Sequence, residues 1–343
     1  MRNQTAMADA AYSVALSTGT LSLAVENGPD IHSLCNFASR ANPKRGFLIV
    51  SKVLGRHLPA RPGDMRDAMN ALADKLSADL PEPVVFLGMA ETATALGQGV
   101  FAHYRKTHPR KTCVYLQTSR QRVDGAQVFA SFEEGHSHAT SHLVQIAGKG
   151  LHKIVSSART LVIVDDESST GNTFLAAGQA VAGSLPDLER IETCCLTDWS
   201  GENYLADLPV SAGANAIISG SMEWDRNENA IAPILAAKSN EAGSAPRTGM
   251  TSRTGLIEPE TAMREPIAAV QGERILVLGD GEHSYEALLI AEEVEEKGAI
   301  AAVQCITRTP ALLGYAMSTV SEFDDAYGCL LYTSDAADDL LCV

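Results

Sequence analysis

The apolar and polar positions of this chain alternate between short continuous apolar runs and longer segments in which apolar residues recur every three or four positions. Continuous runs are typical of strands buried on both faces of a parallel sheet, and the longer spacing is typical of helices. The expected strands are Val84–Gly88, Thr112–Thr118, Thr160–Val164, Ile191–Thr197 and Ala216–Ser219. The expected helices are one capped by Asp64, with Met65, Met69, Leu72 and Leu76 on one face, then Thr92–Arg105 and Phe174–Ala182. This alternation predicts an α/β fold with a doubly wound parallel sheet.

Composition divides the chain into a larger and a smaller folded region. Residues 1–30 give no clear signal, and residues 31–235 carry the expected strands and helices. Residues 236–255 are rich in Ala, Ser, Gly, Thr and Pro, which is typical of a linker, and a second α/β domain is expected over residues 256–328. Its expected elements are a strand at Ile275–Leu278, a helix at Ser284–Lys297 and a strand at Ala299–Thr307. Residues 329–343 resemble translated sequencing-adapter read-through, so we expect a non-native tail and a truncated second domain.

The segment Leu161–Thr173 carries the strongest chemical signal. An apolar run stops at Asp165 and Asp166, and a hydroxyl-rich turn then leads into an apolar helix. Ligands of parallel sheets bind beyond the carboxyl ends of the strands, where such a turn offers N–H groups, hydroxyls and a helix N-terminus to a phosphate. The acid pair suits ribose hydroxyls or Mg²⁺, so the segment suits phosphoribosyl pyrophosphate (PRPP). The residues expected to bind its 5-phosphate are Ser168, Ser169, Thr170, Gly171, Asn172 and Thr173.

Two other interpretations of this segment remain. Paired acids after an apolar strand also open the receiver domains of two-component signalling. Those domains need a lysine at a later strand end, and no lysine occurs between Lys153 and Lys238. The segment can also be an ordinary acidic strand and turn. PRPP binding is the hypothesis that accounts for the acids and the hydroxyl-rich turn together.

A second small-residue loop follows the strand Val84–Gly88. A strand, a tight loop and a helix N-terminus together form an anion cradle. Any turn between a strand and a helix favours small residues, so a plain turn is the alternative. Glu91 would need a bridging magnesium ion to face a pyrophosphate. The residues of this candidate pyrophosphate loop are Ala90, Glu91, Thr92 and Ala93.

The long segment Ser119–Arg159 has no expected strand or helix, and unstructured stretches of this length in compact domains are usually functional lids or disordered. Arg120 can neutralise a leaving pyrophosphate, because arginine is always charged and binds phosphate bidentately. His136, His138 and His142 lie within seven residues. A histidine here can be a general acid or base, or a phosphate donor. Metal binding and a structural or exposed position are the alternatives.

Contacts to an acceptor are the least specific prediction. Lys44 and Arg45 form either an acceptor-binding hood or a solvated basic turn. Trp199 follows a predicted strand and either stacks on an acceptor base or packs in the core. The glycine turn Gly279–His283 can hold a second phosphate, although the dinucleotide fingerprint is absent.

Composition limits the classes of partner. The 343 residues suffice for two domains, and a formal net charge of −15 argues against general binding to nucleic acid or to an anionic membrane. No apolar run approaches the roughly 20 residues that span a bilayer, and the N-terminus does not resemble a secretory signal. The seven cysteines lack Cys-x-x-Cys spacing, which fits reduced buried thiols and argues against a structural zinc site. We therefore expect a cytoplasmic protein.

Leu161–Thr173 closely resembles the PRPP-binding motif of type I phosphoribosyltransferases, although Glu167 stands where many members have an apolar residue. The His-Ser-His-Ala sequence of residues 136–139 and the segment Arg40–His57 resemble the orotate-phosphoribosyltransferase-like family of bacterial tellurite-resistance and stress gene clusters. Members carry a C-terminal domain named for a Thr-Arg-Ser-Pro (TRSP) motif. The similar stretches in this chain are Thr307-Arg308-Thr309-Pro310 and the glycine–glutamate turn Gly279–Glu282.

The resemblance implies transfer of a 5-phosphoribosyl group from PRPP to a nitrogenous, base-like acceptor, with release of pyrophosphate, in a pathway to a nucleoside-like metabolite. It implies that Asp165 and Asp166 meet Mg²⁺ indirectly, through Mg-bound PRPP. It also implies a pyrophosphate loop that often contains a non-proline cis peptide, and a homodimer. Some proteins of this fold sense nucleotides without making them. A non-catalytic PRPP-sensing or nucleotide-sensing regulator is therefore the main alternative, and a scaffold in a stress complex is the third.

Overall fold

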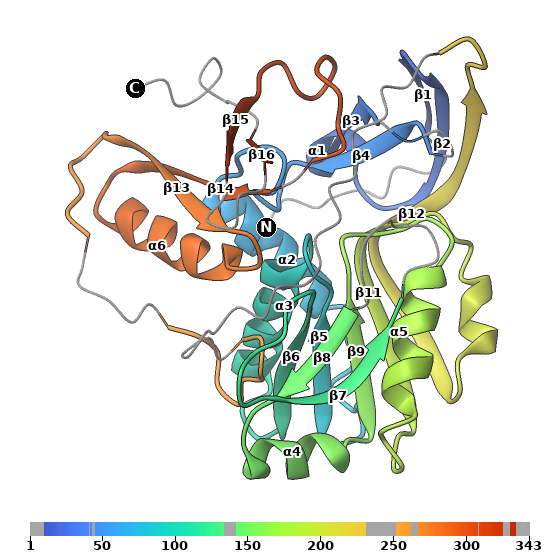
Figure 1. The fold of residues 1–343 in the computed structure, drawn as a ribbon, viewed down its shortest axis with the longest axis vertical. Coiled ribbons are helices and arrows are strands. Elements are labelled where there is room, and N and C mark those ends of the chain that lie inside the picture. Colours follow the sequence, from blue (N-terminus) through green and yellow to red (C-terminus); the bar gives the residue numbers. More distant parts are fainter. Residues whose placement is uncertain are drawn as a thin grey trace. The chain divides into compact units, whose positions relative to one another are not determined.

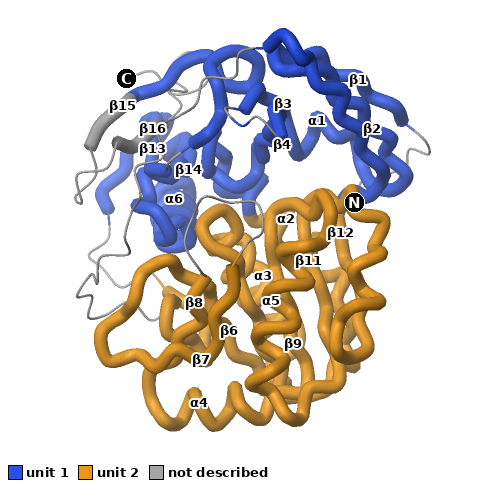
Figure 2. Tube along the Cα trace, turned by 45° about the vertical axis from the view of Figure 1, so that its right-hand side comes forward, with its two compact units in different colours: residues 1–65, 218–238, 262–343 blue, residues 66–217, 239–261 orange. Residues whose placement is uncertain are grey.

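The computed structural model describes residues 10–40, 42, 45–133, 142–230, 252–261, 267–307, 309–324 and 330–333. The chain forms two compact units, shown in blue and orange in Figure 2. Unit 1 comprises residues 1–65, 218–238 and 262–343, and unit 2 comprises residues 66–217 and 239–261. No helix among these described residues is both long and apolar enough to cross a membrane.

The centre of unit 2 is a parallel sheet in the order β11–β9–β5–β6. These strands are β5 (Val84–Gly88), β6 (Cys113–Ser119), β9 (Thr160–Val164) and β11 (Arg190–Asp198). Every residue of β5, β6 and β9 is buried, as expected for strands that are covered on both faces. The predicted α/β class with a parallel sheet is confirmed, and β5 and β9 match their predicted bounds.

Helices α3 (Thr94–Thr107) and α5 (Asn172–Ala182) connect parallel strands of this sheet (Figure 1). Parallel crossovers are right-handed. Because α3 leads from β5 to β6 and α5 leads from β9 to β11, in opposite directions along the sheet, the two helices cover opposite faces. A Cβ added at Gly97 of α3 would lie 2.7 Å from the Gly88 Cα. Glycine at this position therefore allows α3 to approach β5 closely.

The segment predicted as a lid is more regular than expected. It contains β7 (Gln127–Phe132), β8 (His142–Ile146) and α4 (Lys149–Ser156). Strand β8 pairs antiparallel with the end of β6, and β7 pairs antiparallel with β8. All five residues of β8 are buried. The strand is too short to give a clear pattern in the sequence, which is why it was not predicted. His136 and His138 lie outside the described residues.

Further elements of unit 2 lie beside β11 or follow it along the chain. Strand β12 (Ser211–Arg226) begins beside β11 and extends well beyond the predicted Ala216–Ser219. The short strand β10 (Glu167–Ser168) pairs with the end of β11, and a 3-10 helix, η1 (Asn203–Asp207), follows β11. Residues 252–255 of the predicted linker belong to this unit. The next residue, Leu256, exchanges two backbone hydrogen bonds of 2.8 Å with Tyr115.

Helix α2 (Pro62–Ala73) starts before the predicted cap. Asp64 lies inside its first turn, so the prediction that Asp64 caps the helix is wrong. Proline favours the first helical position, since its missing N–H has no partner there in any helix. Leu76 lies beyond the end of α2 but is buried, as are Met69 and Leu72.

Unit 1 contains an N-terminal hairpin that the sequence did not indicate. Strands β1 (Ala10–Leu16) and β2 (Gly19–Asn27) pair antiparallel, and β2 pairs with the second half of β12. The short helix α1 (Ile31–Leu34) precedes a second antiparallel pair, β3 (Cys35–Ser39) and β4 (Phe47–Ser51). Residues from both ends of the sequence therefore build this unit.

The C-terminal part of unit 1 has a strand–helix–strand arrangement. Strands β13 (Arg274–Asp280) and β14 (Ile300–Ile306) are parallel, and α6 (Ser284–Glu296) packs against both. These bounds agree closely with the predicted elements. Strand β15 (Ser321–Asp324) pairs antiparallel with β16 (Leu330–Thr333), which belongs to the segment predicted as a non-native tail.

Candidate active site

The chemical residues of unit 2 collect where parallel strands end. Gly88 at the end of β5 is in register with Val164 at the end of β9 and with Gln117 near the end of β6. The Met89 N–H donates to the Val164 carbonyl over 2.9 Å. The loop after β5, the acid pair after β9 and the segment after β6 therefore leave the sheet side by side. This edge is the position where α/β sheets bind their ligands.

The acid pair is held by backbone contacts with β11. The Asp165 N–H donates to the Cys194 carbonyl over 2.9 Å, and the Asp166 carbonyl accepts from the Leu196 N–H over 3.1 Å. The Asp165 side chain accepts from the Asp166 N–H over 2.9 Å. Both acids are partly exposed. Negative charge is concentrated here: burial, and then the charges of Asp198, Asp165 and Asp166, raise the pKa of the Cys195 thiol.

The hydroxyl-rich turn leads directly into the N-terminus of α5. Thr170 and Asn172 are exposed, and Ser169 and Thr173 are partly exposed. The N-cap residue of α5, Gly171, supplies no side-chain hydrogen bond to the helix, and the Asn172 N–H donates to Oγ1 of Thr170 over 3.4 Å. Ser168 is buried, and its hydroxyl has no hydrogen-bond partner among the residues that the structure describes. The N-terminus of α5 and the surrounding hydroxyls suit an anion such as a phosphate.

Gly171 gives the turn its shape. Its φ of 78° lies in the left-handed region, and a Cβ at this position would lie 2.0 Å from Cδ1 of Tyr204. The Tyr204 ring is buried and stacks on Phe174 with a centroid distance of 5.8 Å. Its hydroxyl lies 2.7 Å from the Thr193 hydroxyl on β11. Tyr204 therefore packs directly against the turn at Gly171, a role for which the sequence gives no local signal.

The loop after β5, which we predicted to bind pyrophosphate, lies next to the acid pair at this sheet edge. The Ala90–Glu91 peptide bond is cis, and Glu91 and Thr92 are partly exposed. The Ala90 N–H donates to Oγ1 of Thr118 over 2.8 Å. The loop is thus bonded to the end of β6 through Thr118, which sequence reasoning did not single out. Arg120 follows two residues later and is partly exposed.

The predicted acceptor contacts are less closely tied to this edge. The Trp199 side chain is only 6% exposed, and the backbone N–H of Trp199 donates to the Ser168 carbonyl over 2.7 Å. Stacking of Trp199 on an acceptor stays a prediction. Arg45 belongs to unit 1, where its guanidinium carbon lies 4.7 Å from the Phe47 ring centroid. Lys44 lies outside the described residues.

The donor set at the edge suits magnesium that arrives with a phosphorylated ligand. Within the described part of the chain, no group of three or more His, Cys, Asp or Glu side chains could by itself hold a metal ion. Magnesium is commonly bound by one or two carboxylates together with substrate phosphates and water. Asp165 and Asp166 fit that mode, whereas they do not form a complete protein cage.

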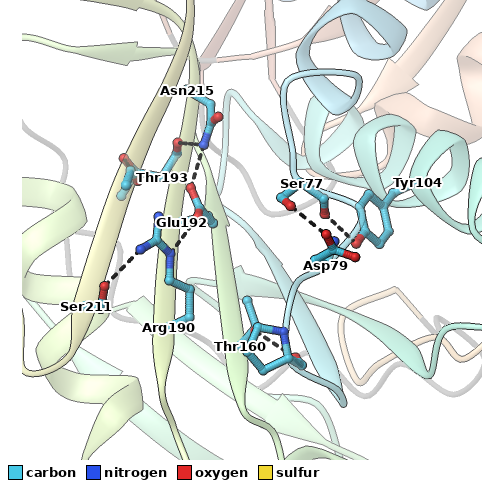
Figure 3. Close-up of polar contacts among 11 residues, drawn as sticks. Ser77, Asp79, Tyr104, Thr160, Arg190, Glu192, Thr193, Ser211 and Asn215 are labelled. Atoms are coloured by element: carbon cyan, nitrogen blue, oxygen red, sulfur yellow. Dashed lines mark hydrogen bonds and ion pairs between the residues drawn. The ribbon is translucent and has the colours of Figure 1, made fainter.

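A polar network around the buried Glu192 links β11 to β12 (Figure 3). The Glu192 carboxylate accepts from Nε of Arg190 over 2.7 Å and from Nδ2 of Asn215 over 2.8 Å. Arg190 also donates to the Ser211 hydroxyl over 2.8 Å. Paired in this way, a buried carboxylate is tolerated. The network holds the strand from which Thr193, Cys194 and Leu196 support the site.

The geometry describes an α/β domain with a hydroxyl-rich turn and an acid pair at one sheet edge. The profile of the phosphoribosyl transferase family matches residues 34–219. The chain therefore belongs to the phosphoribosyl transferase family. No curated protein sequence matches the chain.

Several solved phosphoribosyltransferases are similar to part of the chain. Adenine phosphoribosyltransferase from Rhodothermus marinus DSM 4252 is 16% identical, with a TM-score of 0.36, over 54% of this chain and 95% of that chain. The Trypanosoma brucei enzyme, in complex with AMP, pyrophosphate and ribose-5-phosphate, is 14% identical, with a TM-score of 0.36, over 54% and 77%. Orotate phosphoribosyltransferase from Aeropyrum pernix is 17% identical, with a TM-score of 0.30, over 50% and 78%.

Proposed function

We propose that the protein transfers a 5-phosphoribosyl group from PRPP to a nitrogenous, base-like acceptor and releases pyrophosphate. The observation that carries this proposal is the register of Gly88 with Val164. It sets the candidate pyrophosphate loop directly beside the acid pair, and the hydroxyl-rich turn follows that pair within the same connection. One sheet edge thus offers groups for ribose, 5-phosphate and pyrophosphate, which are the three parts of PRPP.

Each group has a physical role in the proposed reaction. Breaking the bond between the anomeric carbon and pyrophosphate builds positive charge on the ribose and negative charge on the pyrophosphate. The carboxylates of Asp165 and Asp166 hold the ribose hydroxyls and stabilise the positive ring. The turn from Ser168 to Thr173 binds the 5-phosphate, so binding energy far from the reacting bond contributes to catalysis.

The leaving pyrophosphate is received on the other side of the acid pair. Arg120 neutralises its charge, and the backbone of Ala90–Ala93 binds it at the N-terminus of α3. Magnesium bound with PRPP would be held near Asp165 and Asp166 and would supply further neutralisation of the phosphates. His136 and His138, which lie outside the described residues, are proposed as acid or base groups. We further propose a nucleoside-like product, which is what the resemblance to the family of stress and tellurite-resistance gene clusters implies.

The first test is calorimetric titration of the full chain with PRPP and magnesium. The double variant Asp165→Asn/Asp166→Asn keeps the side-chain shape but loses both charges. We expect it to bind PRPP about 10- to 100-fold more weakly, since a hydrogen bond to a charged group contributes about 1.5–3 kcal/mol. Asp187→Asn is the matched control, because Asp187 is an exposed acid that precedes β11, away from the carboxyl edge. Equal binding by the double variant and the control would contradict the proposal.

Catalysis is distinguished from sensing by pyrophosphate release. A panel of purine and pyrimidine bases is added to protein with PRPP and magnesium, and released pyrophosphate is measured. Release that depends on one base identifies the acceptor. Tight PRPP binding without release for any base would favour a non-catalytic regulator.

A further inference from the structure

The Thr118 hydroxyl takes part in two hydrogen bonds, one with the backbone of the loop after β5 and one with a histidine. Its Oγ1 accepts from the Ala90 N–H over 2.8 Å and lies 3.0 Å from Nδ1 of His142. Thr118 is fully buried and His142 is 1% exposed. A threonine hydroxyl has one proton and two lone pairs, so it can serve both neighbours at once. Residues from three separate segments are thereby joined in one buried chain of hydrogen bonds.

His142 is itself held in place by two further contacts. Its ring stacks on Phe132 with a centroid distance of 5.0 Å and an interplanar angle of 3°. Phe132 and His142 face each other in the pairing of β7 with β8. The neighbouring residues Leu143 and Val144 pair with Ser119 and Thr118 of β6. The imidazole therefore has a fixed position relative to the end of β6.

We propose that His142 is a positioning residue that orients the Thr118 hydroxyl and so holds the backbone of Ala90 in the pyrophosphate-binding arrangement. The inference rests on the proposed function and extends it to a residue that does not touch PRPP. With Thr118 directed by His142, a lone pair faces the Ala90 N–H. Without that direction, the hydroxyl can rotate, and a buried N–H at the loop loses its partner. The effect should concern pyrophosphate and spare the ribose 5-phosphate part of the site.

Variants of both residues separate orientation from packing. Thr118→Val removes the hydroxyl and keeps the shape, whereas Thr118→Ser keeps the hydroxyl. His142→Phe keeps the stacking on Phe132 and removes the ring nitrogen, whereas His142→Asn returns a polar atom near the place of Nδ1. Thr160→Val is the matched control. The buried Thr160 hydroxyl donates to the Pro81 carbonyl over 2.7 Å, and Thr160 is the first residue of β9, at the end of the strand away from the acid pair (Figure 3).

The experiment titrates each folded variant with magnesium pyrophosphate and, separately, with ribose 5-phosphate. We expect Thr118→Val and His142→Phe to weaken pyrophosphate binding about tenfold, the equivalent of one net hydrogen bond, and to change ribose 5-phosphate binding less than about twofold. The double variant should lose no more than either single variant, because both remove the same chain of bonds. Thr118→Ser, His142→Asn and Thr160→Val should bind pyrophosphate nearly as the wild type does.

Amide hydrogen exchange gives a second measurement that needs no ligand. The Ala90 amide should exchange faster in Thr118→Val and His142→Phe than in the wild type, and Thr160→Val should leave it unchanged. Equal losses of both ligands, or undiminished pyrophosphate binding with unchanged Ala90 exchange, would overturn the role of His142. A wild-type protein that binds neither PRPP nor pyrophosphate would instead remove the proposed function, and this inference with it.

Discussion

Replacing Gly171 with alanine tests whether the proposed phosphate-binding turn depends on the close approach of Tyr204. The new methyl group would meet Cδ1 of Tyr204 at 2.0 Å, well inside any van der Waals contact. The backbone φ of 78° would also become unfavourable for the new residue. Tyr204 has little room to move, because its ring stacks on Phe174 and its hydroxyl is bonded to Thr193.

The magnitude follows from two separate costs. A left-handed conformation costs a residue with a Cβ about 1–2 kcal/mol relative to glycine. Displacing a packed ring costs about 1–3 kcal/mol more. We therefore expect Gly171→Ala to lower the free energy of unfolding by about 2–5 kcal/mol. Because the turn must shift to relieve the contact, PRPP binding should weaken by at least about tenfold even at temperatures where the variant is folded.

The assay combines urea unfolding with calorimetric titration of PRPP and magnesium. Gly125→Ala is the matched control, since Gly125 has the same φ of 78° and a Cβ there would meet no atom within 4 Å. The control pays only the conformational cost and should keep its PRPP affinity. Gly171→Ala/Tyr204→Leu should recover part of the lost stability. If Gly171→Ala and Gly125→Ala lose the same stability and bind PRPP equally, the steric reasoning is refuted.

Three further predictions concern other parts of the molecule. Gly97→Ala should lower the free energy of urea unfolding by about 1–2 kcal/mol, because the clash with Gly88 outweighs the higher helix propensity of alanine. Gly150→Ala in α4 is the control: the space around Gly150 is open, so this change should be neutral or stabilising. Burial and the charges of two nearby arginines lower the pKa of His57 to about 3, so the free energy of unfolding should fall as the pH drops from about 6.5 toward 3. Between pH 7 and pH 4.5 the wild type should lose about 2–3 kcal/mol more than His57→Gln, and parallel pH profiles of the two proteins would contradict this. Burial raises the pKa of Cys113 to about 12, so iodoacetamide at pH 8 should label this thiol only after unfolding, as followed by mass spectrometry.

The sequence predicted best the elements whose pattern is local. Strands β5 and β9 were predicted with correct bounds because each is a continuous apolar run that ends at a glycine or an acid. The N-terminal strand β1 was missed because its residues are small and mostly partly or fully exposed. Strand β8 was missed because five residues beginning with a histidine give no clear alternation. Its burial comes from pairing with β6 and β7, which the sequence does not reveal.

In the candidate site too, the residues predicted from the sequence are those that one local stretch of chain supplies. Asp165, Asp166 and the turn to Thr173 could be predicted because one stretch of chain supplies the strand end, the acids and the helix start. Neither Thr118 nor Tyr204 could be assigned a role, since each meets the site only through tertiary contacts. Tyr204 is 33 positions from Gly171, and Thr118 is 28 positions from Ala90. Their residue types are ordinary for buried positions, so composition gives no warning of the contact.

These two contacts suggest how the sheet controls the geometry of its loops. The candidate ligand-binding groups belong to connections after β5 and β9, whereas the side chains that support them belong to the end of the neighbouring strand β6 and to η1, which follows β11. Thr118 bonds the loop backbone at Ala90, and Tyr204 limits the approach of Gly171. Such supports set where the N–H groups point, and binding of an anion depends steeply on that direction. Variants that abolish PRPP binding should therefore include changes at buried residues that never reach the ligand, and the loss should appear as lowered affinity in a protein that still unfolds cooperatively.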